Sequence, residues 1–276
     1  MLGWGFGDFF IQKATRKIDD WEPLFLITFF GAIILLPFVY DKIPAALSST
    51  KDVLILFGAS AVLFFAALLD FEALKKGKLS VVEPIWSWEI PVGAFLAYMV
   101  FGEKITLSQL LLIVSLVTGL FMVSLKSLNI LKKIWVERAV YLALASATTM
   151  GAANFLIGWG ARVTDPLTIN WFVNISVALL CLIYIAFTRP LSDITKNIRK
   201  HPWIIAGMCI FDNSAWIAFA YAMVLIPIAI AVSLSESYII VVVLLGLFVN
   251  KENIKVHQKV GLIIAILSAI ALAAIS

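Results

Sequence analysis

Long apolar runs separated by short charged connectors limit the folds open to this chain more than any other feature. A helix needs roughly 20 apolar residues to cross the hydrocarbon core of a bilayer. These runs are continuously apolar, without the alternation of a barrel strand, so we predict helices. The ten runs are approximately 2–15, 23–40, 53–74, 80–101, 106–125, 138–160, 166–187, 203–224, 228–249 and 257–275. The first is short, and covers about half a bilayer unless Lys13 and Arg16 extend to the surface.

Composition agrees with a membrane protein. Apolar residues make up 62% of the 276 residues and charged residues 14%, against about 45–50% and about 25% in a soluble domain. A soluble protein could not bury so much apolar surface. We therefore predict an all-α polytopic protein, integral to the cell membrane with ten transmembrane helices, and exclude nucleic-acid binding.

Motifs of enzymes and cofactor sites are missing from the sequence. It contains no HExxH, no GxSxG and no P-loop, so we expect neither an enzyme, an ATP-driven pump nor a cofactor. Cys181 and Cys209 lie in apolar runs without metal-ligand spacing, so we expect no metal. Asp8 and Asp212 could formally supply an intramembrane aspartyl pair, the weakest alternative.

Basic residues gather on one side of the predicted membrane. Of the 21 Lys and Arg residues, 17 fall in the connectors after the odd-numbered runs. The positive-inside rule makes that side cytoplasmic and places both termini outside.

The two halves of the chain repeat. Glu103-Lys104-Ile105 with Gln109 recurs 149 residues later as Glu252-Asn253-Ile254 with Gln258. Five helices per repeat is an odd number, so the second copy enters the membrane from the opposite side, as in many secondary transporters. We predict repeats over 1–128 and 138–276 with a connector at 129–137. Small residues spaced four apart, such as Ser115 with Gly119 and Ala265 with Ala269, predict close helix approach within the chain or in a homodimer.

In their order, these features resemble the EamA-type branch of the drug/metabolite transporter superfamily. The motifs are the proline-containing fourth helix, the turn Gly102-Glu103-Lys104-Ile105-Thr106 followed by Gln109, and the third-helix ending Phe71-Glu72-Ala73-Leu74. The resemblance implies a central cavity and transport of a small solute. Three points depart from the family pattern. The first helix is short, the second Glu connector lacks the glycine, and the family usually keeps both termini cytoplasmic.

Acidic residues inside apolar runs are the first candidates for a site, because a charge within a bilayer costs about 2.5–3.5 kcal/mol and usually faces a cavity or a partner. Glu89 and Glu236 fall at similar depths in the fourth helices of the two halves, and Asp8 corresponds to Asn154 in the opening helices. Such carboxylates could attract a cationic solute or take up protons. Alternatively, they only orient helices through buried hydrogen bonds. We expect Asp70, Glu72 and Glu83 to pair with lysines near the surface, and Glu103 and Glu252 to cap the following helix or pair across the connector.

Aromatic and polar residues accompany these acids. Pro84 and Pro91 predict a kink in the fourth run that frees carbonyl groups, with Trp86 and Trp88 as stacking or cation–π surfaces. The remaining candidates are the polar and aromatic residues Asp212, Asn213, Trp216 and Tyr238. The alternative is an ordinary packed kink with lipid-facing tryptophans.

The sequence thus predicts a secondary transporter of a small, cationic or zwitterionic organic solute, by proton antiport or facilitated diffusion. The alternative from another class is a non-transporting membrane scaffold or lipid-binding protein. The partners we expect are the solute, membrane lipid and a second copy of the chain in a homodimer.

Overall fold

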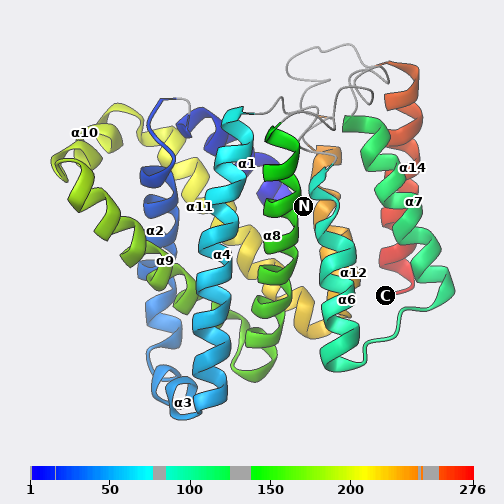
Figure 1. Ribbon diagram of the computed structural model, residues 1–276, viewed down its shortest axis with the longest axis horizontal. Helices are drawn as coiled ribbons and strands as arrows, with labels where there is room; N and C mark the ends of the chain where they lie inside the picture. The colour runs from blue at the N-terminus through cyan, green and yellow to red at the C-terminus, as the bar shows by residue number, and fades with distance from the viewer. Residues whose placement is uncertain (1, 16, 77–84, 125–137, 242–243, 245–254) are drawn as a thin grey trace. The chain divides into compact units, whose positions relative to one another are not determined.

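The structure, a computed structural model, describes every residue except 1, 16, 77–84, 125–137, 242–243 and 245–254. The described part of the chain is helical and contains no strand. Its helices, which Figure 1 labels where there is room, are α1 Leu2–Thr15, α2 Trp21–Val39, α3 Ile43–Ser48, α4 Thr50–Lys76, α6 Glu89–Phe101, α7 Leu107–Ser124, α8 Arg138–Val163, α9 Pro166–Thr188, α10 Ser192–Lys200, α11 Pro202–Leu225, α12 Ile228–Glu236 and α14 Val256–Ala274.

The apolar runs become helices close to the predicted bounds. Among the described residues, six helices are long and apolar enough to cross a membrane, namely α2, α4, α8, α9, α11 and α14, whereas α6, α7 and α12 are shorter. The number of ten spans therefore stays a prediction. The connector 129–137, Glu83 and Glu252 lie outside the described residues. Two short helices, α3 and α10, fall in stretches that we interpreted as connectors.

Local signals set several helix ends. Asp165 caps α9, because its carboxylate accepts the N–H groups of Leu167 (2.9 Å) and Thr168 (3.2 Å), and Pro166 begins the helix. α6 ends at Gly102, whose φ of 64° is the left-handed conformation that favours glycine at a helix end.

Glu103 caps a helix other than the one we considered first. The start of α7 is capped instead by a reciprocal pair, in which Thr106 N–H donates to Gln109 Oε1 (3.0 Å) and Gln109 N–H donates to Thr106 Oγ1 (3.2 Å). Glu103 Oε2 accepts the N–H of Ile228 (2.9 Å), the first residue of α12 in the other half of the chain. A carboxylate stabilises any nearby helix N-terminus, so sequence proximity did not decide its partner.

The described residues form two compact units that do not coincide with the sequence repeats. The first unit contains residues 62–155 and 225–276, and the second contains 2–61 and 156–224. Each unit therefore takes helices from both halves of the chain, and α4 and α8 contribute to both units.

In the first unit, α7 and α14 pack against each other along their length (Figure 1). Ser268 Oγ donates to Ser115 Oγ (2.9 Å), and Gln258 Nε2 donates to the Val123 carbonyl (2.8 Å). A Cβ atom at Gly119 would lie 2.7 Å from the backbone nitrogen of Ala265, so the predicted small residues do allow close approach within the chain. Residue numbers rise along one helix as they fall along the other, so the two run antiparallel.

Two further pairs of helices also run antiparallel. In the second unit, α2 packs against α9, with the rings of Trp21 and Tyr184 stacked at 3.7 Å and Gly31 close to Asn174. In the first unit, α6 packs against α12. Each pair joins corresponding helices of the two halves, the second with the seventh, the fourth with the ninth and the fifth with the tenth. An antiparallel course of corresponding helices is what an inverted repeat requires.

Candidate functional site

The fourth apolar run is interrupted at Ser87 and Trp88. The chain is helical before this turn, and α6 begins directly after it at Glu89. Trp88 N–H donates to a carbonyl only three residues earlier (2.9 Å), which is tighter than α-helical pairing. Pro91 has no N–H to donate in the first turn of α6. The interruption agrees with the predicted kink, although Pro84 lies outside the described residues.

The ninth apolar run is interrupted at the corresponding place. α12 ends at Glu236, and Ser237 forms a turn whose N–H donates to a carbonyl three residues earlier (3.3 Å). With the displacement of 149 residues that relates the two halves, Ser87 corresponds to Glu236 and Trp88 corresponds to Ser237. A glutamate borders each interruption. Glu89 directly follows the first, and Glu236 directly precedes the turn at Ser237 in the second.

These glutamates belong to a polar cluster inside the first unit. Glu89 is 9% exposed, and its Oε2 accepts a hydrogen bond from Asn154 Nδ2 on α8 (3.0 Å). Glu89 also interacts electrostatically with Glu236, itself buried, and with Asp70 on α4. Asp70 in turn accepts a hydrogen bond from Ser146 Oγ on α8 (3.3 Å). The predicted pairing of Asp70 with nearby lysines falls on side chains outside the described residues. The contact with Ser146 was not predicted, because the apolar sequence around Asp70 does not show which helix it faces.

The two glutamates lie at helix ends of opposite partial charge. Glu89 is the first residue of α6, where the helix dipole carries partial positive charge, and Glu236 is the last residue of α12, where the dipole carries partial negative charge. The backbone thus favours an anion beside Glu89 and a cation beside Glu236.

Gly151 lets the backbones of α8 and α6 approach at this point, whereas a side chain at Gly93 would make only an ordinary contact. A Cβ atom at Gly151 of α8 would lie 2.8 Å from the Glu89 carbonyl oxygen and 2.8 Å from Cβ of Val92. A Cβ atom at Gly93 would lie 3.6 Å from Val232 of α12. Close contact at Gly151 brings the Asn154 side of α8 to the start of α6.

The predicted aromatic residues divide between buried and exposed positions. Trp86 is half-buried and packs near Ala73 and Ala143, and Trp88 is 49% exposed. The indole Nε1 of Trp86 and the hydroxyl of Ser87 are buried and make no hydrogen bond to any described residue. Tyr238 is half-buried. The turn before Glu89 therefore holds polar hydrogens that the described part of the chain does not use.

Asn213 binds backbone in the second unit. Its Nδ2 donates to the carbonyls of Ile27 (3.0 Å) and Cys209 (2.9 Å), and its Oδ1 accepts from Asn174 Nδ2 (3.1 Å). The amide thus ties α11 to α2 and α9.

Three further candidates also lie in the second unit. The ring of Trp216 meets that of Trp4 edge-to-face at 5.4 Å. Asp212 is half-buried, and a Cβ atom at Gly7 of α1 would lie 3.4 Å from its backbone nitrogen. The side chain of Asp8 lies outside the described residues.

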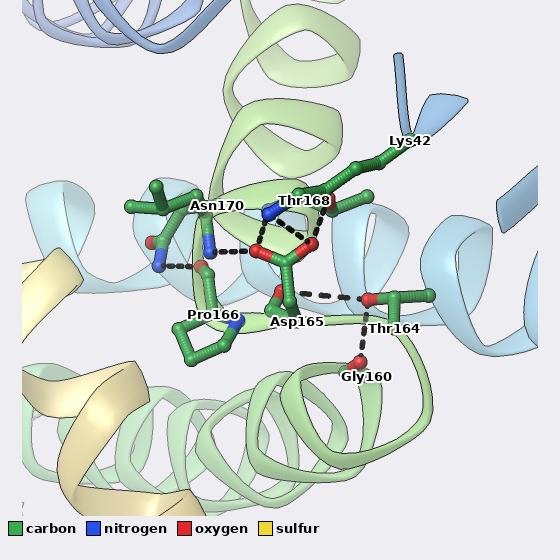
Figure 2. A network of polar contacts seen from close by, with 8 residues as sticks. Lys42, Gly160, Thr164, Asp165, Pro166, Thr168 and Asn170 are labelled. Atoms are coloured by element: carbon green, nitrogen blue, oxygen red, sulfur yellow. Dashed lines mark hydrogen bonds and ion pairs between the residues drawn. The ribbon is translucent and has the colours of Figure 1, made fainter. Parts of the chain in front are cut away.

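The second unit also holds a network of polar contacts around Asp165 (Figure 2), next to a pocket that the sequence did not point to. Besides capping α9, the Asp165 carboxylate accepts a hydrogen bond from Thr168 Oγ1 and lies 3.5 Å from Lys42 Nζ. The pocket has a volume of about 340 Å³ and is lined by Asp41, Lys42, Ala45, Ala46, Asp52, Val163, Thr164, Asp165 and Thr168. Asp165 was not singled out because an aspartate before a proline is an ordinary helix start.

Comparison with known proteins identifies the family. The model of the EamA-like transporter family matches residues 1–125 and 137–274, in two repeats that together cover nearly the whole chain. The chain belongs to the EamA-like transporter family. One solved structure, titled "Crystal structure of protein", shares the fold with a TM-score of 0.74 and 12% identity, over 99% of this chain and 95% of that one. No curated protein matches the chain at a significant level.

Membership gives the general role of the chain. Members of the EamA-like family are membrane transporters of the drug/metabolite superfamily, and the long apolar helices agree with an integral membrane protein. In this EamA chain the structure brings together Glu89, Asn154 and Glu236, with Asp70 and Ser146 as additions. Among the described residues, no group of His, Cys, Asp and Glu is placed to hold a metal ion.

Proposed function

We propose that this EamA-like chain moves a small organic solute, cationic or zwitterionic, across the cell membrane without ATP, by proton antiport. We assign Glu89 and Glu236 to solute and proton binding. The observation that carries the proposal is a buried glutamate at each of two corresponding helix interruptions, with electrostatic contact between the two.

Charge balance supports a positive ligand. Glu89 forms no ion pair with a basic side chain of the described residues, and the side chain that donates to it, Asn154, is neutral. Glu236 and Asp70 add further negative charge beside it. Burying the Glu89 carboxylate without a counter-charge is costly, so a cationic group or a proton beside it would be stabilising.

Proton antiport follows if one cluster serves both ligands. A carboxyl group that binds a proton cannot at the same time bind an ammonium group, so uptake of one releases the other. Such competition couples a solute to the proton gradient.

The neighbouring polar and aromatic groups would set the orientation of the solute. The unused N–H of Trp86 and hydroxyl of Ser87 can donate to a carbonyl or carboxylate of a zwitterion, and Trp88 or Tyr238 can stack on a cation. We assign Asp8, Asp212 and Trp216 to the solute path of the second unit, and Asn213 to holding α11 in place.

The test is transport by the full chain in proteoliposomes with an imposed pH gradient. Choline serves as the cationic probe, glycine betaine as the zwitterionic probe and glucuronate as the anionic comparison. We expect a gradient-dependent flux of the first or second probe, at least tenfold lower in Glu89→Gln and in Glu236→Gln, because a neutral amide cannot exchange a proton. Asp193→Asn, an acid on α10 outside the cluster, serves as the control and should keep the flux.

Three outcomes contradict the proposal. A solute flux that does not depend on the pH gradient contradicts the proposed proton antiport. Equal flux in the wild type and both glutamine variants contradicts the assignment of Glu89 and Glu236 to transport. A higher flux of glucuronate than of the other two probes contradicts a cationic or zwitterionic solute.

Membrane orientation is tested separately. From the distribution of basic residues we propose that both termini lie outside. A reporter fused to the C-terminus that is active only in the cytoplasm should stay inactive, and activity would reverse the orientation.

A further inference from the structure

α10 has two chemically different faces. At 100° per residue, the apolar side chains Leu191, Ile194 and Ile198 fall on one side of the helix axis, and the basic side chains Lys196, Arg199 and Lys200 fall on the other. This pattern is typical of a helix that lies in the surface plane of a membrane.

Other segments of the second unit contact α10 on its apolar side and next to it. Ile194 is buried, and Asn197 Nδ2 donates to Glu22 Oε2 of α2 (3.1 Å). Arg189, between α9 and α10, reaches the same carboxylate (3.2 Å) and that of Asp19 (2.7 Å). These contacts fix which side of α10 faces outward.

The outward side carries uncompensated positive charge. Lys196 pairs with Asp193 of the same helix (2.7 Å), whereas Arg199 and Lys200 are exposed and pair with no described residue. His201 follows directly, and partial burial lowers its pKa, which Lys17 and Lys200 lower further. Lys17 therefore belongs to the same positive region.

Aromatic and apolar side chains flank this region. Phe187, just before α10, is 88% exposed, and Trp203, just after it, is 85% exposed. Exposed aromatic rings beside lysine and arginine mark the level of lipid headgroups.

We propose that α10 is an interfacial helix whose basic side binds the headgroups of anionic phospholipids. Arg199, Lys200 and Lys17 contact the phosphates, while Trp203 and Phe187 enter the acyl boundary. The connector that contains α10 lies on the basic-rich side of the chain, the predicted cytoplasmic side, where anionic lipids are common. This site is separate from the solute cluster, so it does not depend on the proposed transport.

The test measures lipid selectivity of the full chain in phosphatidylcholine bilayers. Spin-labelled phosphatidylglycerol and phosphatidylcholine report the relative association of each lipid with the protein. We expect the double variant Arg199→Gln/Lys200→Gln to lower the preference for phosphatidylglycerol about tenfold. The matched control is Lys255→Gln/Lys259→Gln, which removes two exposed basic residues from the first turn of α14 on the same predicted side and should keep most of the preference.

An unchanged preference in the α10 variant overturns the proposal, as does an equal loss in the α14 variant, which would indicate general surface charge. A second measurement uses the wild type and so does not depend on folding of a variant. The NMR titration midpoint of His201 should rise when phosphatidylglycerol replaces phosphatidylcholine, since a bound anion offsets Lys17 and Lys200. A midpoint that does not move contradicts anion binding at α10.

Discussion

Glu89 in the first unit and Glu22 in the second are both buried glutamates in the first turn of an apolar helix, yet their surroundings differ. Glu22 is fully buried and receives a guanidinium, from Arg189 (3.2 Å), and an amide, from Asn197 (3.1 Å). Among the described residues, Glu89 receives only the amide of Asn154 (3.0 Å), and it lies near two further acids.

The difference follows from position along the helices. Glu22 begins a helix next to a charged connector, where the basic residue at the end of α9 can reach it. Glu89 begins α6 at an interruption inside an apolar run, where a lysine or arginine would itself be costly to insert. The helix start near a connector thus obtains a structural ion pair, whereas the carboxylate at the interruption has no basic partner among the described residues. Four predictions test this contrast.

The largest expected effect is on the ion pair of Glu22. Arg189→Met should lower the free energy of unfolding by about 3 kcal/mol, because it leaves a fully buried carboxylate without a counter-charge. Denaturant unfolding in neutral detergent measures it. The control Arg199→Met removes an exposed, unpaired arginine and should change stability by less than about 0.5 kcal/mol; similar losses in both variants would contradict the structural role of the pair.

The contact between α8 and α6 comes next. Gly151→Ala should cost about 1–2 kcal/mol, because the new Cβ atom meets the Glu89 carbonyl and Val92 at 2.8 Å. Gly58→Ala is the matched control, since no atom lies within 4 Å of its Cβ position and alanine is the better helix former. Thermal unfolding should rank wild type between the two variants, and the reverse order would show that α8 does not approach α6 at Gly151.

A smaller effect is expected at the Asp165 cap. Asp165→Ala should cost about 1 kcal/mol, because the N–H groups of Leu167 and Thr168 lose their acceptor. Asp165→Asn keeps an acceptor oxygen and loses only the exposed pair with Lys42, so it should cost about half as much or less. Equal losses in the two variants, by denaturant unfolding, would assign the stability to the ion pair instead.

The smallest effect on stability is expected at Glu89. Glu89→Gln should change the free energy of unfolding by less than about 1 kcal/mol, because the amide can still accept from Asn154 and no ion pair is lost. Glu22→Gln should be clearly more destabilising, because it removes the buried one of the two carboxylates that pair with the partly buried Arg189. If the two glutamine variants lose the same stability, Glu89 is a structural residue like Glu22 and the contrast fails.

Much of the architecture could be predicted from the sequence because the signals are local. Continuous apolar runs gave the helices, and Pro91 indicated the interruption before α6. Glu89 and Glu236 lie 147 residues apart, within two residues of the displacement of 149 that relates the halves, and so were placed at similar depths. α10 was taken for a connector because its polar residues outnumber its apolar ones, although its spacing is helical.

By itself, then, the sequence determined that this is a helical membrane protein of the EamA type with two related halves and acids at the middle of its fourth helices. Only the tertiary structure decided which groups meet: Glu103 with the start of α12, Glu22 with Arg189, and Asn154 with Glu89. The physical reason is that hydropathy and capping act over a few residues, whereas these partners are 65 to 167 residues apart. Nearly uniform apolar helices offer many faces, and close packing at small residues such as Gly151 selects the face that is used.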